Sequence, residues 1–185
     1  MDVLECINEK RSSRAYTDEV ISKDVIKNLI ELGTKAATGS NQQPWGFVTI
    51  DDKEEIDHLS EITKTYLKEH LADYPYLAQY ESWFDNPNFS VFNHAANLIL
   101  IYGNTKSHWY VYDCSLAAGN IMLAAHSMGI GTCWIGFAEH TLNTKEFKET
   151  YHIPEEYQLV STLSLGYMSK HLNPPKRKEP LIFHP

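Results

Sequence analysis

Asn97-Leu-Ile-Leu-Ile-Tyr-Gly103, written NLILIYG, is a continuous apolar run with the length of one β-strand. A strand whose residues are apolar on both faces needs cover on both sides, so the run is predicted to lie in the middle of a sheet. The run is far too short to span a lipid bilayer.

Helices and strands are expected to alternate on both sides of this strand. Ser22 is suited to capping one helix, and Asn143 with Glu146 resembles a capping box for a short helix near residue 150. Helical periodicity is found at residues 2–11, 23–33, 53–71 and 109–128, and further strands are expected at 47–50, 132–137 and 157–168. Helices separate consecutive strands, which indicates an α+β or α/β fold, and we expect one domain over residues 1–185.

Two segments have an unusual composition. Residues 109–128 contain many small side chains, which predicts a central helix that is buried on more than one side. Residues 66–92 contain many aromatic side chains. These aromatic residues are expected to form either a lid over a binding site or ordinary helix packing.

Composition and charge exclude several classes of function. The formal net charge of −8 argues against a nucleic-acid or anionic membrane partner. Cys6, Cys114 and Cys133 lie far apart, and the nine histidines lack ligand spacing, so no metal site is predicted. Scattered cysteines and an N-terminus without an apolar signal core lead us to expect a cytoplasmic protein.

Two basic segments interrupt this acidic chain. The first is Lys10-Arg11-Ser12-Ser13-Arg14, and the second is Lys176-Arg177-Lys178 near the C-terminus. Hydroxyl groups beside guanidinium groups suit a phosphate, because they offer many donors at short range. The alternative for the first segment is a solvated, charged helix end.

Common catalytic and nucleotide-binding motifs are absent from the sequence. There is no G-x-G-x-x-G, P-loop, H-E-x-x-H or G-x-S-x-G pattern. Gly129 and Gly131 follow a predicted helix and precede a strand, which is the reverse of the Rossmann context. His126 is interpreted as a core or surface histidine rather than a ligand, and Asp113 as a helix-start carboxylate rather than a catalytic acid.

An ordered set of segments resembles the nitroreductase family of FMN-dependent oxidoreductases. The segments, in chain order, are KRSSRAYTDEVIS, AATGSNQQPWGFV, DCSLAAGNIMLAAHSMGIGTCWIGF, LSLGYM and NPPKRKEPL. The chain departs from the family pattern at Ala37-Thr38, where Pro-Ser is usual, and at Gly136, which stands alone before Phe137. The resemblance covers most of the chain except residues 55–92.

The resemblance implies a set of FMN-binding residues. The phosphate and ribityl chain would be bound by Lys10, Arg11, Ser12 and Arg14. The flavin ring edge would be approached across a dimer interface by Thr38, Gly39, Ser40, Asn41 and Gln43. Backbone amides near the ring would come from Cys133, Trp134, Ile135 and Gly136. The C-terminal basic pair on the phosphate would be Lys176 and Lys178, or would include Arg177 after a slip of one residue.

The same resemblance implies a fold and a reaction. The fold would be α+β, with a central mixed or antiparallel sheet flanked by helices and a C-terminal arm exchanged in a homodimer. FMN would carry the chemistry, so no catalytic side chain is assigned. NAD(P)H would reduce the flavin, and a small flat electron acceptor such as a nitroaromatic or a quinone would then reoxidise it in a ping-pong cycle. The alternatives are a reductive dehalogenase, a flavin-fragmenting relative, or a flavin-binding protein without catalysis.

Overall fold

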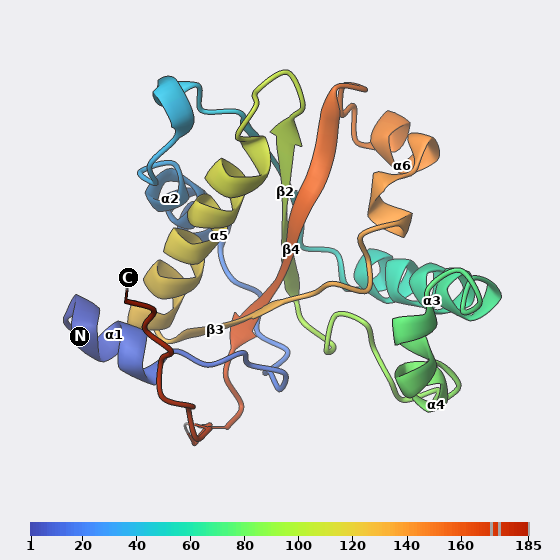
Figure 1. The fold of residues 1–185 in the computed structure, drawn as a ribbon. Helices are drawn as coiled ribbons and strands as arrows, with labels where there is room; N and C mark the ends of the chain where they lie inside the picture. The colour runs from blue at the N-terminus through green and yellow to red at the C-terminus, as the bar shows by residue number, and fades with distance from the viewer. Residues whose placement is uncertain (171, 174, 185) are drawn as a thin grey trace.

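The structure is a computed structural model that describes residues 1–170, 172–173 and 175–184. The helices are α1 (Val3–Glu9), α2 (Lys23–Gly33), α3 (Lys53–Glu69), α4 (Glu81–Phe84), α5 (Tyr110–Ser127) and α6 (Lys145–Thr150). The strands are β1 (Trp45–Ile50), β2 (Asn97–Asn104), β3 (Ile130–Trp134) and β4 (Tyr157–Tyr167). Figure 1 shows how these elements surround one sheet.

The four strands form one antiparallel sheet in the order β1-β2-β4-β3. β2 pairs with β1 on one side and with β4 on the other, as its apolar sequence predicts. Its side chains alternate between the two faces of the sheet: Ile99 and Ile101 belong to one apolar core, and Leu98 and Leu100 belong to the other. All four are fully buried, so the α+β prediction with an antiparallel sheet is confirmed.

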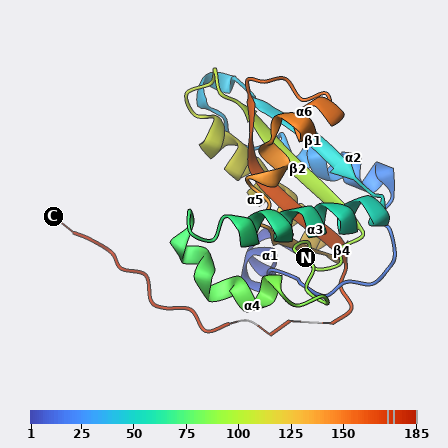
Figure 2. The same cartoon turned by 90° about the vertical axis from the view of Figure 1, so that its right-hand side faces the viewer.

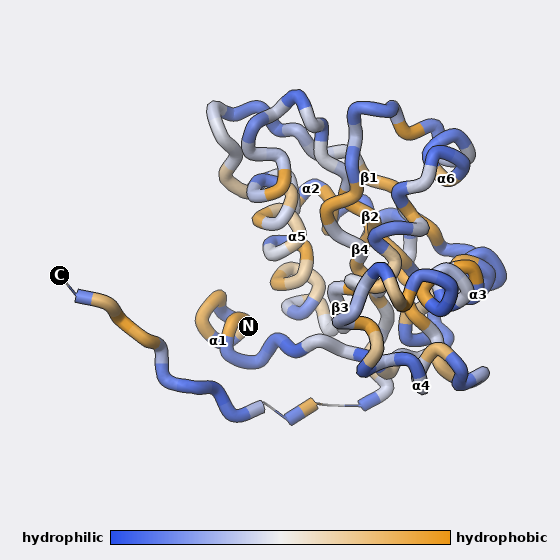
Figure 3. The backbone as a smooth tube through the Cα atoms, turned by 45° about the vertical axis from the view of Figure 1, so that its right-hand side comes forward, coloured by the Kyte–Doolittle hydropathy of each residue, from blue (hydrophilic) through white to orange (hydrophobic). Residues whose placement is uncertain are grey.

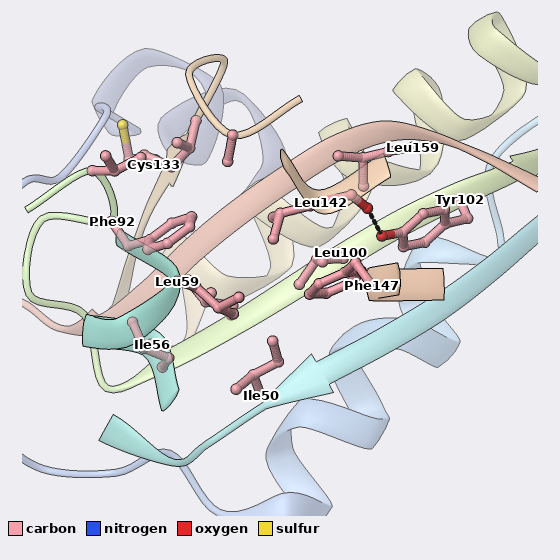
Figure 4. Packing of buried hydrophobic residues seen from close by; sticks show 14 residues of the cluster. Ile50, Ile56, Leu59, Phe92, Leu100, Tyr102, Cys133, Leu142, Phe147 and Leu159 are labelled. Atoms are coloured by element: carbon pink, nitrogen blue, oxygen red, sulfur yellow. Dashed lines mark hydrogen bonds between the residues drawn. The ribbon is translucent and has the colours of Figure 1, made fainter. Parts of the chain in front are cut away.

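Helices cover both faces of the sheet and make a three-layer arrangement (Figures 1 and 2). α2 and α5 pack on the face that carries Ile99 and Ile101, and α1 contacts α5. α3 and α6 contribute Leu59 and Phe147 to the core on the opposite face, where Figure 4 shows them beside Leu100 and Tyr102. Among the described residues, no helix combines the length and the apolar character needed to cross a membrane.

Most of the expected elements differ by one or two residues at their ends, and the third strand and the cap of the short helix differ further. The third strand covers Ile130–Trp134 rather than 132–137, although the Ile135 amide still donates to the Thr162 carbonyl at 2.8 Å. The prediction that Asn143 caps the short helix is wrong, because the hydroxyl of Thr144 accepts from the Phe147 amide. The Asn143 side chain instead bonds to Gln158 across the fold, so a tertiary contact overrides the local pattern.

α5 is covered by the sheet and by α2 but keeps a further face exposed. Ala118 and Ala125 are fully buried in the core over the sheet, and Ala117 is fully buried beside Gly33 of α2. The first half of the helix, however, has an exposed apolar face made of Trp109, Val111, Tyr112 and Leu116. α5 contacts both the sheet and α2, so the predicted burial on more than one side is confirmed, but this further face is left open in the single chain. A hydrophobic face of this kind marks an interaction surface.

The aromatic segment between α3 and β2 packs mostly against itself. Leu67, Leu77 and Phe84 form a small third core, and partly buried aromatic residues including Phe89 and Phe137 surround it. Phe137 follows Gly136 directly, so this packing is attached to the turn after β3. The packing alternative therefore describes most of the segment, while Trp83 remains half-exposed.

The hydroxyl of Tyr102 provides a test of the core. Tyr102 is fully buried, and it donates a hydrogen bond of 2.5 Å to the Leu142 carbonyl (Figure 4). We expect Tyr102→Phe to lower the free energy of unfolding by about 1–3 kcal/mol, because the buried carbonyl loses its donor. Urea denaturation measures this change.

The matched control is Tyr76→Phe, because Tyr76 is exposed on the aromatic segment. This substitution should change the free energy of unfolding by less than about 0.5 kcal/mol. Equal effects of the two substitutions would contradict the assigned role of the Tyr102 hydroxyl.

Candidate functional site

The first basic segment, residues 10–14, lies along the edge of the sheet that β3 forms. It follows α1 and runs beside β3, where Ser12 forms an isolated parallel bridge with Thr132. The Ser13 amide donates to the Thr132 carbonyl at 2.9 Å. Two sequence-predicted groups, residues 10–14 and residues 133–136, are therefore neighbours in the folded chain.

The thiol of Cys133 is influenced by the charges of Lys10 and Arg14 in this segment. Its side chain is buried, and burial raises the pKa of its thiol, while the charges of Arg14 and Lys10 and a hydrogen bond with Ser12 lower it. Burial also lowers the pKa of Lys10, and the nearby Cys133 acts in the opposite direction. Lys10 is half-buried, with its ammonium group 3.3 Å from the Met122 sulfur on α5.

The segment and the neighbouring β3 contain buried polar atoms without a hydrogen-bond partner among the described residues. Arg11 donates from Nη1 to the Lys10 carbonyl at 2.7 Å, but its buried Nε has no hydrogen-bond partner among the described residues. Within the same described part of the chain, the buried Thr132 hydroxyl also lacks one. Buried polar groups are normally satisfied, so a bound group with acceptor oxygens would suit this place.

The turn after β3 is open toward solvent. Trp134 is partly exposed, Ile135 is buried and Gly136 is exposed. A Cβ atom placed on Gly136 would meet no heavy atom within 4 Å. Contacts inside the chain therefore do not require glycine at this position. The open backbone leaves room for a close approach by a group from outside the chain.

The loop of residues 38–43 has a defined but unusual conformation. Ser40, Asn41 and Gln43 all have positive φ angles, which is uncommon for residues other than glycine. The Thr38 hydroxyl accepts from the Gln43 amide at 3.0 Å and closes the loop. Asn41 and Gln43 are exposed, and the Gln43 amide group donates to Asn41 Oδ1 at 3.3 Å. Their polar groups are therefore accessible to a ligand.

One chain does not bring this loop to the basic segment. The Gly39 amide contacts Asp113 near the start of α5, whereas Lys10 contacts Met122 near its end. Nine residues of helix at 1.5 Å each separate these two contact points by about 14 Å. Figure 1 shows α1 at one end of α5 and the light-blue segment around residue 40 at the other.

The C-terminal basic residues are also apart from the basic segment near α1. Lys176, Arg177 and Lys178 are exposed, and the tail runs away from the body of the chain (Figures 2 and 3). Leu181, Ile182 and Phe183 are 85%, 70% and 90% exposed. Of the tail predicted to exchange, residues 174 and 185 lie outside the described residues.

The sequence interpretation missed three contributors to this region. Thr132 holds the basic segment through its backbone, and no sequence signal marks it. Tyr16 donates from its hydroxyl to the Ser13 carbonyl at 2.5 Å and lies close to Ser164. Asp113 lies at a helix start as expected, but it also accepts a hydrogen bond from the loop.

Comparison with known proteins identifies the family of this chain. The family model described as Nitroreductase family matches residues 7–167. A protein of Archaeoglobus fulgidus, assigned the name NADH dehydrogenase/NAD(P)H nitroreductase, is 30% identical over 171 residues that cover 90% of this chain and 85% of the relative. A similarly named protein of Methanothermobacter thermautotrophicus is 29% identical, with 90% of this chain and 78% of the relative covered.

A solved structure shows the same likeness in three dimensions. The nitroreductase with bound FMN from Bacteroides fragilis NCTC 9343 superposes with a TM-score of 0.84 at 26% sequence identity. The superposition covers 99% of this chain and 98% of that structure. Fold, motif order and family match agree, and this chain belongs to the nitroreductase family.

Proposed function

We propose that this protein is an FMN-dependent oxidoreductase that uses NAD(P)H to reduce a small flat acceptor such as a nitroaromatic or a quinone. The observation that carries the proposal is the bridge between Ser12 and Thr132, which sets the basic segment of residues 10–14 beside β3 and the open turn that follows it. In the proposed site these residues would donate to a terminal phosphate, and the open backbone of the turn would border a flat ring joined to that phosphate. Family membership and the FMN-containing relative support the same assignment.

The residues present fit an FMN phosphate. Arg11 has a buried Nε without a partner among the described residues, and Arg14, three residues further along, is exposed. Lys10, Arg11, Ser12 and Arg14 would hold the phosphate and ribityl chain, and residues 133–136 would border the ring. When bound, FMN supplies the hydride transfer, so the chain itself needs no acid–base pair.

The chain's task is then to position one flat molecule at a time. The turn at Trp134 and Gly136 is exposed, which leaves one side of the proposed ring site accessible. The sequence has no Rossmann fingerprint, so the nicotinamide would use this same open face. NAD(P)H and the acceptor would therefore bind in turn, which gives ping-pong kinetics.

The complete site requires two chains. The loop of residues 38–43 and the basic segment lie at opposite ends of α5, about 14 Å apart along the helix axis. Two copies related by a two-fold axis, with their α5 helices antiparallel, would bring the loop of one copy to the basic segment of the other. The exposed apolar faces of α5 and α1 would supply the interface; on α1 they are Val3, Leu4 and Ile7.

The C-terminal tail would strengthen this homodimer as an added strand. β1 is an edge strand, so one of its sides offers unpaired backbone groups. A groove next to this edge is lined by Ile21, Ile26 and Ile30, by Thr49 of β1, and by the charged side chains of Lys23, Lys27, Glu31 and Asp51. The exposed Leu181, Ile182 and Phe183 of a second copy would fill such a groove. The cations at residues 176–178 would then reach the phosphate of the shared site.

The cofactor is tested by extraction. Purified protein should be yellow, and the released flavin should run as FMN in chromatography. Under anaerobic conditions NADH or NADPH should bleach the flavin absorbance. Extraction of FAD, or no flavin after reconstitution with FMN, would refute the proposal. A yellow protein that neither nucleotide bleaches would instead be the flavin-binding protein without catalysis.

Arg14→Ala should weaken FMN binding by about 5- to 150-fold, because one charged donor to the phosphate or ribityl chain is lost. The fold should survive, since Arg14 is exposed and, within the described part of the chain, its hydrogen bond to protein is a 3.5 Å contact with the Ser12 carbonyl. Fluorescence titration of the apoprotein with FMN measures the effect. Lys145→Ala is the control: Lys145 is an exposed cation on α6 and should leave the affinity unchanged. Unchanged affinity for Arg14→Ala would restore the solvated-helix interpretation.

Deletion of residues 173–185 should remove the dimer and the flavin together, because it removes both the apolar arm and three cations. Light scattering and flavin absorbance measure the two losses. The double substitution Lys176→Ala/Lys178→Ala separates them: it should weaken FMN binding and leave the dimer intact. A truncated protein that stays dimeric and fully yellow would contradict the role given to the tail.

A further inference from the structure

Asp113 is a buried carboxylate without an opposite charge beside it. It is 3% exposed, and no lysine, arginine or histidine within the described part of the chain forms an ion pair with it. Both carboxylate oxygens face the Gly39 amide, at 3.1 and 3.2 Å. A buried charge is costly, and here the start of α5 and one amide donor compensate for it.

The contact is reinforced by a close approach at Gly39. A Cβ atom at this position would lie 2.5 Å from Trp109 Cδ1, so the indole leaves no space for a larger residue. Trp109 precedes α5 and Asp113 lies in its first turn. The start of the helix therefore holds Gly39 from two sides, by packing and by a hydrogen bond.

The contacts of Gly39 with Asp113 and Trp109 are important because the loop of residues 38–43 forms few other hydrogen bonds with the rest of the chain. Within residues 38–43 the remaining hydrogen bonds are internal, from Asn41 to Thr38, from Gln42 to Gly39 and from Gln43 to Thr38 and Asn41. Among the described residues, the bond to Asp113 is the one hydrogen bond from the loop to another element. Three residues with positive φ are kept in place with this single polar anchor.

We infer that Asp113 is a positioning residue for the flavin site: through Gly39 it fixes the loop that presents Asn41 and Gln43. The inference rests on the function proposed above, in which this loop contacts the flavin ring in the partner's half of the site. Asp113 itself touches neither cofactor nor substrate in this arrangement. Its effect is to keep the loop that carries the exposed side chains of Asn41 and Gln43 in one conformation.

The experiment compares Asp113→Ala, Asp113→Asn and Asp52→Ala in the FMN-loaded dimer. Asp52 is the matched control, because it also accepts from backbone amides at a helix start, those of Glu54 and Glu55 on α3. Hydrogen exchange is measured at the Asn41 and Gln43 amides, which do not contact Asp113. FMN affinity and the separate values of kcat and KM are measured alongside.

Asp113→Ala should speed exchange at these two amides by about 10- to 100-fold, because the loop loses its anchor. FMN affinity should fall by about 5- to 30-fold with the dimer intact. Asp113→Asn keeps an acceptor oxygen and should stay within about threefold of the unchanged protein. Asp52→Ala should leave loop exchange and FMN affinity unchanged.

Each outcome decides the inference. Equal losses in Asp113→Ala and Asp52→Ala, or unchanged loop exchange in Asp113→Ala, would overturn it. If Asp113→Ala does not fold, Gly39→Ala disturbs the same contact, because the added Cβ would collide with Trp109. This substitution should speed hydrogen exchange at the amides of Asn41 and Gln43. If the unchanged protein binds no FMN, the proposed function fails, while the exchange measurement still tests the anchor.

Discussion

The double-sided burial of β2 is the constraint on which the rest of the fold depends. Leu98 and Leu100 on one face and Ile99 and Ile101 on the other must all leave water, at about 1.5–3 kcal/mol of stabilisation for each side chain. Neither face can remain solvated, so the chain needs a helical layer on each side. α5 fills one layer, and α3 with α6 fills the other. The basic segment and the loop of residues 38–43 then lie near the two ends of α5.

α5 belongs to the core and also sets the distance between the loop of residues 38–43 and the basic segment near α1. Its buried alanines let it lie close to the sheet, and its two ends carry different contacts, Gly39 at the start and Lys10 near the end. A rigid helix keeps these contacts apart in every conformation of the single chain. The separation makes a shared site between two copies the simplest way to use both groups together.

Much of this arrangement could be predicted from residue patterns, and the exceptions have physical causes. The central position of β2 and the Ser22 cap follow from local sequence, and the structure confirms both. The neighbourhood of Lys10 and Cys133 depends on the bridge between Ser12 and Thr132, which joins residues far apart in sequence. Asn143 has a capping residue's chemistry, but Gln158 competes for its side chain. Asp113 reads as a helix-start residue, since its contact with Gly39 spans 74 positions.

The length of the C-terminal tail has a consequence for how copies join. Leu181 follows the end of β4 at Tyr167 by 14 residues, a stretch that extends up to about 45 Å. Such a reach passes beyond the chain's own body to a neighbour. When two neighbours insert their tails into each other, assembly stops at a closed pair. A tail inserted in one direction only would leave a free edge and a free tail at the two ends, and growth would continue as a filament. In the proposed pair, the two-fold symmetry would therefore keep a protein with an open strand edge from polymerising.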